Sequence, residues 1–445
     1  MPFIILIAKI LSFLGGLLGR GSSMPGAVAL KLCPGILGKL KINACVIAVS
    51  GSNGKTSTTE MIRKLAVSQG KRVICNSEGS NQTEGVVTAL LKESDLFGRI
   101  NADYIILESD ERFCQYTFRN FTPDWFVILN LYRDQLTRNG HPEYVKGELA
   151  KGIPSGSSLV INCDEPISAS LAQNRAGDVL GFGVSPEVFC ENGISHVYDD
   201  GAKCPVCDGE MDYEYRIISH LGSYKCSSCG YSRRIPVHTV SDRLEKGYLI
   251  DGRYPVVPQL DNPMFAYNIA AAFTVAVNVM KIIPEEAAKQ LSDYHLENTF
   301  QARIEDFELA GNPGTFILCK HENSIAYDGA IHTVCSSDDP QKTVLIAVDK
   351  LSRKYSANDM SWLWDIDFER LDRDDVAGIY LCGRFADNLA MRLLFAGISS
   401  EKITSIPDFG KCVEKLAEKG KGHIFAMTCF TDAPALMQHL KEETK

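Results

Sequence analysis

Residues 46–57 read Val-Ile-Ala-Val-Ser-Gly-Ser-Asn-Gly-Lys-Thr-Ser, and this stretch decides the fold. The apolar, β-branched run at 44–50 predicts a buried strand, and a helical pattern follows from about 56 to 69. A Gly-rich turn between a strand and a helix is the context that a phosphate loop requires. Gly51 and Gly54 let backbone N–H groups turn toward phosphate at the positive end of the helix. The stretch therefore predicts a nucleotide site.

The residues after the last glycine indicate ATP and Mg²⁺. Lys55 is expected to reach the β- and γ-phosphates, and Thr56 to bind the metal. Mg²⁺ prefers oxygen ligands, so a carboxylate is expected at a neighbouring strand end, and Glu108 is the best candidate. Asp110 and Glu111 are equally consistent with solvated surface charges. The residues expected to bind nucleotide in the loop are Gly51, Asn53, Gly54, Lys55, Thr56 and Ser57.

Further apolar runs predict an α/β fold. Runs at 104–107, 125–129 and 159–162 read as short buried strands, and the first two stop at polar residues. Such strands favour a parallel sheet whose carboxyl edge carries the site. Helices are expected at 262–279 and 284–291. A second α/β unit begins at about 301, with strands expected at 315–318, 343–348 and 378–382.

Composition bounds the class of protein. A chain of 445 residues predicts two or three domains, and its net charge of -9 argues against a nucleic-acid partner. The 15 cysteines are odd in number and mostly isolated in apolar runs, which argues against a disulfide framework and favours the reducing cytoplasm.

The N-terminal residues 3–18 are apolar apart from Lys9. The run is short for a membrane span, and no convincing signal cleavage site follows it. Two interpretations stay open: a helix packed on its own protein, or a helix on the membrane surface, which would place the chain at the inner face of the cell membrane.

A polar, Gly-rich stretch at about 184–240 reads as an insertion and contains two Cys-x₂-Cys pairs eighteen residues apart. This is the spacing of a zinc ribbon, in which four thiolates close a tetrahedral, structural site. Two redox or unligated pairs are the alternative. The predicted zinc ligands are Cys204, Cys207, Cys226 and Cys229.

The loop Gly-Ser-Asn-Gly-Lys-Thr resembles the Gly-Thr-Asn-Gly-Lys-Thr loop of the Mur ligase and folylpolyglutamate synthase superfamily, whose members make acyl phosphates from ATP and attack them with amines. Residues 262–272 look like the family helix beside adenine, which implies that Asn268 lies near the base. Arg303, in Ala-Arg-Ile-Glu, resembles the arginine that begins the third family domain and contacts ATP.

The resemblance implies a Mur ligase-type central domain with a parallel sheet and an inserted zinc ribbon, followed by a Rossmann-like α/β domain. The boundaries expected are 1–43 for an N-terminal helical segment, 44–300 for the central domain with the ribbon at about 200–235, and 301–445 for the C-terminal domain.

Four segments resemble one branch of that family, the MurT subunits of lipid II isoglutaminyl synthase. They are the leader residues at 24–26 and 34–37, Asn-Leu-Tyr-Arg-Asp-Gln-Leu at 130–136, the ribbon, and a motif at 359–369 that begins Asp-Met-Ser-Trp-Leu-Trp-Asp.

In that branch ATP activates the α-carboxylate of D-glutamate in the lipid II stem peptide, and ammonia from a class I glutaminase partner, GatD, displaces phosphate. The resemblance implies that Asp359 completes the partner's Cys-His triad, with Asp365 the weaker candidate. Trp362 and Trp364 are expected either to contact the partner or to pack in the core.

Two departures from the branch leave the acceptor open. Residues 76–81 read Asn-Ser-Glu-Gly-Ser-Asn where the branch has Asn-Arg-Ala-Gly-Ser-Asn. Residues 320–324 read Lys-His-Glu-Asn-Ser in place of Lys-Asn-Pro-Ala-Gly. The alternatives are a stand-alone amino-acid ligase of the Mur or folylpolyglutamate type, and a non-catalytic nucleotide-binding scaffold.

Overall fold

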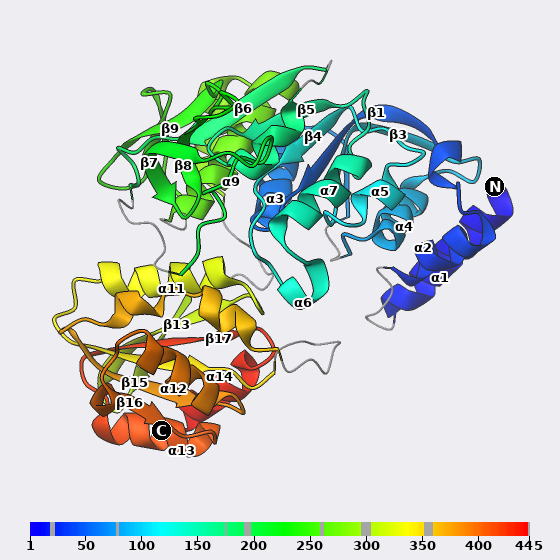
Figure 1. The fold of residues 1–445 in the computed structure, drawn as a ribbon. Helices are drawn as coiled ribbons and strands as arrows, with labels where there is room; N and C mark the ends of the chain where they lie inside the picture. The colour runs from blue at the N-terminus through cyan, green and yellow to red at the C-terminus, as the bar shows by residue number, and fades with distance from the viewer. Residues whose placement is uncertain are drawn as a thin grey trace. The chain divides into compact units, whose positions relative to one another are not determined.

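The computed structural model describes residues 1–17, 23–76, 80–173, 175, 177–190, 197–258, 262–294, 304–350 and 359–443, without the side chains of Leu17, Thr137 and Ile304. The chain divides into two compact units (Figure 1). Unit 1 comprises Met1–Tyr132, His141–Ile194 and Asp199–His295, and unit 2 comprises Arg133–Gly140, Ser195–Tyr198 and Leu296–Lys445.

Nine strands of the described residues form the sheet of unit 1, in the order β11-β10-β9-β6-β5-β4-β1-β3-β2. Neighbours from β2 to β9 pair in parallel, and β10 and β11 extend the sheet antiparallel. The strands are β1 (Lys41–Ser50), β2 (Val73–Cys75), β3 (Arg99–Glu108), β4 (Trp125–Ile128), β5 (Ser158–Asn162), β6 (Val179–Val184), β9 (His238–Arg243), β10 (Tyr248–Ile250) and β11 (Tyr254–Val256).

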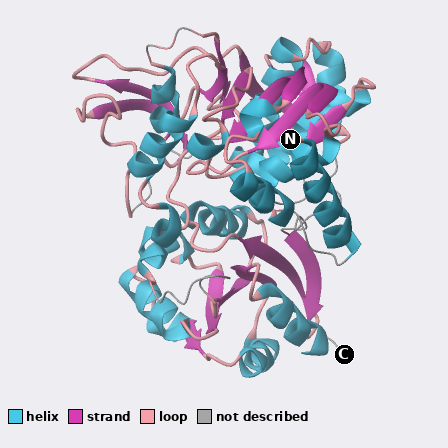
Figure 2. Ribbon diagram, turned by 90° about the vertical axis from the view of Figure 1, so that its right-hand side faces the viewer, coloured by secondary structure: helices cyan, strands magenta, loops and turns pink. Residues whose placement is uncertain are grey.

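Helices cover both faces of this sheet (Figure 2), because its central strands are apolar on both sides. Val46 and Ala48 of β1 point into the core beneath α4 (Thr83–Glu93), α5 (Cys114–Thr117), α7 (Pro142–Gly152) and α8 (Pro166–Ala169), after which η2 (Ser170–Ala172) follows. The alternate residues Ile47 and Val49 are also fully buried, on the other face. That face carries α3 (Lys55–Ser68), α9 (Pro263–Thr274), its π-helical continuation η3 (Val275–Val279), and α10 (Pro284–Ser292).

The N-terminal segment folds as α1 (Pro2–Leu17), α2 (Met24–Leu32) and the short η1 (Leu37–Lys39). α2 approaches α4 closely: the Gly26 N–H donates to Thr88 Oγ1 at 2.8 Å, and a Cβ on Gly26 would lie 1.9 Å from the Glu84 carbonyl oxygen. α1 buries Ile5 and Ala8 against this pair of helices. Among the helices that the structure describes, none has both the length and the apolar character to cross a membrane.

An antiparallel hairpin, β7 (Met211–Ile218) and β8 (Leu221–Cys226), is inserted between the parallel neighbours β6 and β9. Its small core contains Cys204, Met211, Tyr224, Cys226 and Tyr231. The prediction of an insertion in this part of the chain is confirmed.

In unit 2, six strands of the described residues form a second sheet in the order β12-β13-β17-β14-β15-β16, antiparallel only at β12. They are β12 (Ile304–Leu309), β13 (Asn312–Cys319), β14 (Lys342–Ala347), β15 (Val376–Cys382), β16 (Ile403–Ser405) and β17 (His423–Cys429). One face packs under α11 (Ser324–Ser336), α12 (Ala386–Phe395), η4 (Ser361–Asp365) and η5 (Phe368–Leu371). The other face packs under α13 (Phe409–Lys419) and α14 (Ala433–Glu443). The short helix η6 (Ser400–Lys402) directly precedes β16. Helix α6 (Leu136–Asn139) belongs to the segment Arg133–Gly140 of this unit.

The predicted α/β fold is confirmed, with two differences in its elements. β1 begins at Lys41, three residues before the apolar run, and the helix expected at 262–279 changes to π-helix at Val275.

Candidate functional site

The phosphate loop connects β1 to α3 as predicted. Gly51 has φ 142° and Gly54 has φ 86°, both in the region that side chains disfavour. Gly54 is the N-cap of α3, and a Cβ on it would lie 2.1 Å from Asn268 Oδ1 of α9. Glycine is therefore needed at 54 for both its backbone angle and its contact with α9.

Asn130, directly after β4, holds the loop from the neighbouring strand. Its Oδ1 accepts the Asn53 N–H at 2.9 Å, and its Nδ2 donates to the Asn53 carbonyl oxygen at 3.1 Å. The Ser52 N–H also donates to the Asn130 carbonyl oxygen, at 2.9 Å. Sequence analysis did not assign this role, although an asparagine at a strand end beside the loop was the available signal.

The predicted magnesium ligands meet at the end of β3. Thr56 Oγ1 donates to Glu108 Oε2 at 2.8 Å, and Asn81 Nδ2 donates to Glu108 Oε1 at 3.0 Å. Asn76 fixes the backbone of Glu108, accepting its N–H and donating to its carbonyl oxygen, both at 2.8 Å. A hydroxyl and a carboxylate held together at the phosphate loop are a donor set that fits Mg²⁺.

Lys55 pairs with Glu111, a contact that sequence analysis did not predict. Its Nζ lies 2.7 Å from Glu111 Oε1 and also donates to the Gly51 carbonyl oxygen. Asp110 and Glu111 are only 5% and 4% exposed, so the interpretation of both as solvated surface charges is wrong. Burial raises the pKa of Glu111, while the Lys55 ammonium opposes that shift.

Asn268 faces the phosphate loop from α9. Its Oδ1 is buried and accepts no hydrogen bond from any described residue, as expected of a group that awaits a ligand. The loop, the N-terminus of α3 and this oxygen fit a nucleotide, and the contact of Asn268 with adenine stays a prediction. Arg303 lies outside the described residues.

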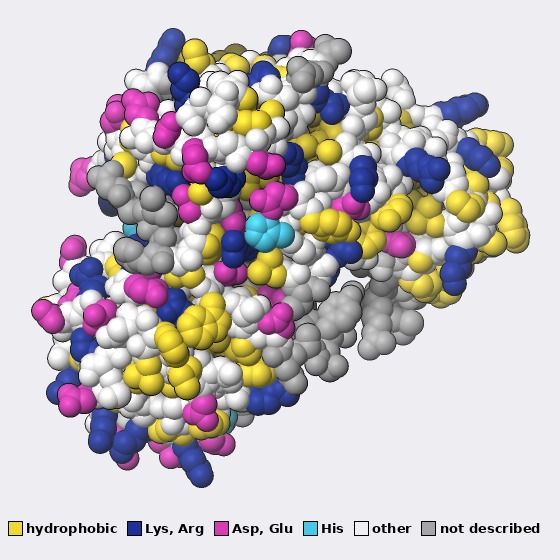
Figure 3. All heavy atoms as spheres, viewed as in Figure 1, with side chains coloured by type: hydrophobic (Ala, Val, Ile, Leu, Met, Phe, Trp, Pro, Cys, Tyr) yellow, Lys and Arg dark blue, Asp and Glu magenta, His cyan; other side chains and the backbone are white. Residues whose placement is uncertain are grey.

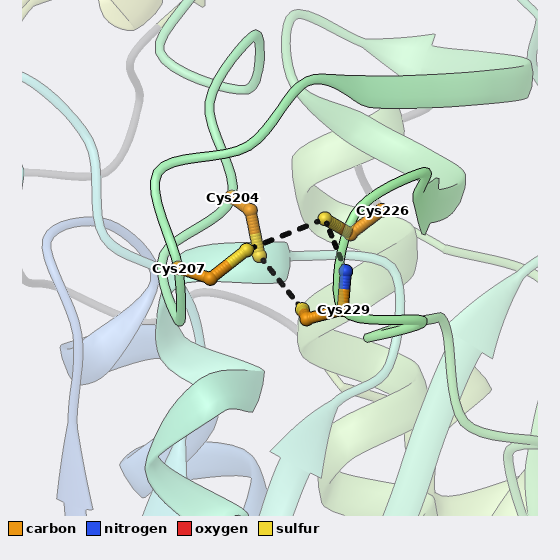
Figure 4. A group of neighbouring side chains, drawn as sticks. All are labelled: Cys204, Cys207, Cys226 and Cys229. Carbon is orange, nitrogen blue, oxygen red and sulfur yellow. Dashed lines mark hydrogen bonds between the residues drawn. The ribbon is translucent and has the colours of Figure 1, made fainter.

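The four predicted zinc ligands converge at the ribbon (Figure 4). Their sulfur atoms all lie within 4.8 Å of one another, with Cys204–Cys229 at 3.7 Å and Cys207–Cys226 at 3.6 Å. Tetrahedral zinc with Zn–S bonds of about 2.3 Å requires sulfur atoms about 3.8 Å apart. The cluster is therefore compatible with a closed zinc site.

Backbone N–H groups favour the thiolate form at the second knuckle. The amides of Cys229 (Figure 4) and Ser228 each donate to Cys226 Sγ at 3.4 Å and lower the pKa of this thiol to about 6. Thiolate is the form of cysteine that ligates metal.

The turn of the ribbon hairpin is anchored beneath the strand ends. His220 and Glu165 are both fully buried, and Nε2 of the imidazole hydrogen-bonds to Glu165 Oε1 at 3.1 Å. Glu165 also accepts the Leu131 N–H at 3.1 Å, and the His220 ring lies 4.7 Å from that of Tyr132. The ribbon thereby contacts the residues that directly follow Asn130.

The next residues of the same motif pack within unit 2. Arg133 Nη1 lies 2.8 Å from Asp365 Oδ1. Asp134 accepts from Lys320 Nζ at 2.5 Å and from Asn323 Nδ2 at 2.9 Å. In the motif at 130–136, Asn130 therefore holds the phosphate loop within unit 1, whereas Arg133 and Asp134 pack within unit 2.

The motif that begins at Asp359 contains one exposed and one paired carboxylate. Asp359 is exposed, and the Ser361 N–H donates to its Oδ1 at 2.9 Å, which holds its pKa below the usual value. Asp365 is 9% exposed and pairs with Arg133.

The two tryptophans of this motif likewise differ in burial. Trp362 is 4% exposed and belongs to the core, whereas Trp364 is 45% exposed. The ring of Trp364 packs on Phe395, itself 70% exposed, with centroids 5.3 Å apart.

Comparison with known proteins assigns the class. Residues 49–224 match the Mur ligase middle domain, and residues 321–432 match the MurT ligase C-terminal domain. The fold is similar to that of a pseudomurein peptide ligase type C from Methanothermus fervidus, with a TM-score of 0.65 and 20% identity over 92% of this chain and 80% of that one. The chain is an ATP-dependent ligase with domains of the Mur ligase type, and that family implies ATP and Mg²⁺.

Within that family the similarity narrows to one type. The chain is 26% identical over 430 residues to the MurT subunit of lipid II isoglutaminyl synthase (glutamine-hydrolyzing) from Streptococcus pneumoniae, covering 93% of this chain and 91% of the relative. It is 24% identical to the subunit of the same name from Staphylococcus aureus, covering 95% and 93%. These matches confirm the resemblance to the MurT branch.

Proposed function

We propose that this chain is the synthetase subunit of a two-subunit enzyme that amidates the α-carboxylate of D-glutamate in the lipid II stem peptide, giving D-isoglutamine. The observation that carries the proposal is a phosphate loop with Thr56 and Glu108 in contact, on a chain whose C-terminal domain is of the MurT type. The similarity to MurT subunits over nearly the whole chain supports the acceptor.

In the first step, phosphoryl transfer from ATP to the acceptor carboxylate, the residues of the phosphate loop have different roles. Lys55 and the N-terminus of α3 bind the β- and γ-phosphates, with Asn53 held in place by Asn130. Thr56 and Glu108 would hold Mg²⁺, which would neutralise charge on the phosphates. A carboxylate oxygen of the acceptor attacks the γ-phosphorus, the bond to ADP breaks, and an acyl phosphate forms.

In the second step ammonia attacks the acyl carbon, loses a proton, and expels inorganic phosphate to leave the amide. We assign the ammonia to a GatD-like class I glutaminase that forms a heterodimer with this chain. Asp359 is exposed and kept ionised by Ser361, which suits a carboxylate that orients and stabilises a partner's imidazole. Asp365 is the poorer candidate because Arg133 neutralises it.

The departure at 320–324 bears on the acceptor. Lys320 and Asn323 both bind Asp134, and His321 Nε2 lies 2.6 Å from Thr431 Oγ1. Since these side chains face their own unit, their divergence from the MurT pattern leaves the acceptor unchanged in this proposal. Ser77 and Glu78 lie outside the described residues.

We assign a structural zinc ion to the four ribbon cysteines, because four thiolates leave no open coordination position. The chain is placed in the cytoplasm, at the inner face of the membrane that carries its lipid-linked acceptor. Reduced thiols fit that compartment.

The test is the nitrogen source. With ATP and a lipid II-like acceptor, ammonia or a glutaminase partner with glutamine should support amidation, and free amino acids should not. Ligation of a free amino acid without amidation would favour the stand-alone ligase. ATP binding without turnover under any condition would favour the scaffold.

Lys55→Ala should abolish amidation with either nitrogen source, because the phosphates lose their cation. Lys71→Ala is the matched control: this lysine pairs with Asp103, away from the loop, with its side chain 46% exposed. Equal activity of the two variants would remove Lys55 from the mechanism.

A further inference from the structure

α1 presents an apolar face that the described part of the chain leaves exposed. Five side chains between 45% and 72% exposed follow one another at helical spacing: Phe3, Leu6, Ile10, Phe13 and Leu14. At about 100° of turn per residue they occupy one arc of about 100°. The opposite face carries the buried Ile5 and Ala8. Figure 3 shows hydrophobic side chains gathered over α1 and α2.

The charge of the N-terminal segment that carries this face is one-sided. Residues 1–41 contain five lysine or arginine residues and no aspartate or glutamate, in a chain whose net charge is -9. Lys31, Lys39 and Lys41 are exposed, and Lys9 donates from the flank of α1 to the Lys92 carbonyl oxygen at 2.6 Å. An acidic protein with one cationic, apolar end has the charge that complements an anionic surface.

We propose that the exposed face of α1 docks on the surface of an anionic lipid bilayer. Apolar side chains enter the boundary between headgroups and acyl chains while neighbouring lysines bind headgroup phosphates. A second copy of this chain is the poorer occupant, because a two-fold contact would place like charges together. The inference goes beyond the proposed reaction, since it depends only on the surface of α1.

The docked helix lies in the plane of the membrane. Its 16 residues span about 24 Å, less than the hydrocarbon core of about 30 Å. Ile5 and Ala8 pack on α2 and α4, so α1 would have to leave the protein in order to insert. In-plane contact keeps this packing intact.

The experiment is flotation of the full chain with vesicles of phosphatidylcholine, alone or with part replaced by phosphatidylglycerol. Wild type should float with the anionic vesicles, and added salt should weaken the association. Phe3→Ser with Phe13→Ser should lower the partition coefficient by roughly tenfold for each side chain. Ile235→Ser, which removes a side chain 92% exposed elsewhere in unit 1, is the matched control and should float like wild type.

Charge reversal tests the second part of the proposal. Lys31→Glu with Lys39→Glu should weaken flotation with anionic vesicles by roughly tenfold or more. If wild type floats with neither vesicle, or if the double phenylalanine variant floats as well as wild type, the proposal is wrong. Self-association of wild type without lipid, lost in that variant, would assign the face to a second copy.

A tryptophan in the exposed face of α1 tests the proposal without removing an apolar side chain, and so without the risk that a serine variant misfolds. In Phe13→Trp, the fluorescence added to that of wild type should move to shorter wavelength with anionic vesicles, and an unchanged spectrum would overturn the proposal. Amidation of an acceptor with a short, water-soluble tail should persist in the double phenylalanine variant. Loss of flotation with retained amidation therefore separates this inference from the proposed function.

Discussion

Arg133 Nη1 lies 2.8 Å from Oδ1 of Asp365, in η4, and this pair ties the segment after β4 to the motif that begins at Asp359. Only three residues earlier, Asn130 holds the backbone of the phosphate loop. The first contact lies within unit 2 and the second within unit 1, so the division between the units falls inside the motif at 130–136.

Breaking this pair should destabilise unit 2. The side chains of Arg133 and Asp365 are 21% and 13% exposed, so Arg133→Ala leaves a mostly buried carboxylate without its cation and should cost about 1–3 kcal/mol. Urea unfolding measures the loss. Arg253→Ala breaks a pair whose side chains are 71% and 57% exposed and should cost less than about 1 kcal/mol. If Arg133→Ala and Arg253→Ala lost equal unfolding free energy, the Arg133–Asp365 pair would contribute no more to stability than an exposed pair.

Asp359→Asn should separate the two nitrogen sources. If its carboxylate orients the partner's imidazole, glutamine-dependent amidation should fall by at least about a hundredfold while ammonia-dependent amidation persists. Glutaminase kcat should drop without a change in the affinity of the subunits. Asp374→Asn alters an exposed carboxylate of the same unit and should have no effect. Loss of both nitrogen sources in Asp359→Asn would refute the assignment.

The two tryptophans of this motif should respond differently. Trp364→Ala removes an exposed side chain and should weaken binding of the glutaminase partner by roughly tenfold or more, with stability unchanged. Trp362→Ala empties a core position and should cost about 3–5 kcal/mol of folding stability. Calorimetric titration and thermal unfolding distinguish the outcomes, and unchanged affinity in Trp364→Ala would place the partner on another surface.

Glu111 predicts a dependence of stability on pH. Burial raises its pKa above the ordinary value of 4.5, so the folded protein binds this proton more tightly than the unfolded chain does. The protonated Glu111 side chain therefore contributes stability at pH values below 4.5, and this contribution is lost as the pH rises through the pKa of Glu111 in the folded protein. Glu111→Gln cannot ionise, so its melting temperature should fall less than that of wild type between about pH 5 and pH 8. Parallel curves for the two proteins would contradict the burial argument, and Glu245→Gln, at an exposed site, is the control.

Metal analysis should find one zinc ion per chain. Cys226→Ser should lose it, and the segment 200–235 should become sensitive to proteases, because ribbon folding and metal binding are coupled. Cys190→Ser changes an exposed cysteine outside the cluster and should keep the zinc. A wild-type chain that is free of zinc and resists proteolysis would show that the ribbon folds on its own.

Local patterns made much of this structure predictable. The phosphate loop is specified by consecutive residues, and β3, β4 and β5 follow from apolar runs buried on both faces. The pairing of β6 with β9 was not predictable, because the ribbon separates two short strands that meet only in the sheet.

Contacts in the candidate site were likewise not predictable from the sequence where they depend on strand register. Glu108 and Glu111 lie in one acidic cluster, and only the register of β1 and β3 places Glu108 beside Thr56 and buries Glu111 at Lys55. Trp362 and Trp364 stand two residues apart, and the turn of η4 decides which of them is buried. In both pairs the three-dimensional structure, and not the spacing of the residues along the sequence, decides which side chain is buried and what it contacts.

The carboxylate of Glu165 has consequences for how the ribbon can be inherited. It accepts the backbone N–H groups of Ile167 and Ser168, both at 2.8 Å, and that of Leu131, and its fourth partner is His220 from the inserted hairpin. Excising the insertion would remove His220 from Oε1 of this fully buried carboxylate and leave that oxygen with the Ile167 N–H as its described donor. A chimera lacking the ribbon would keep three of the four partners of this carboxylate, so loss of His220 should weaken the site without leaving the buried charge unsatisfied.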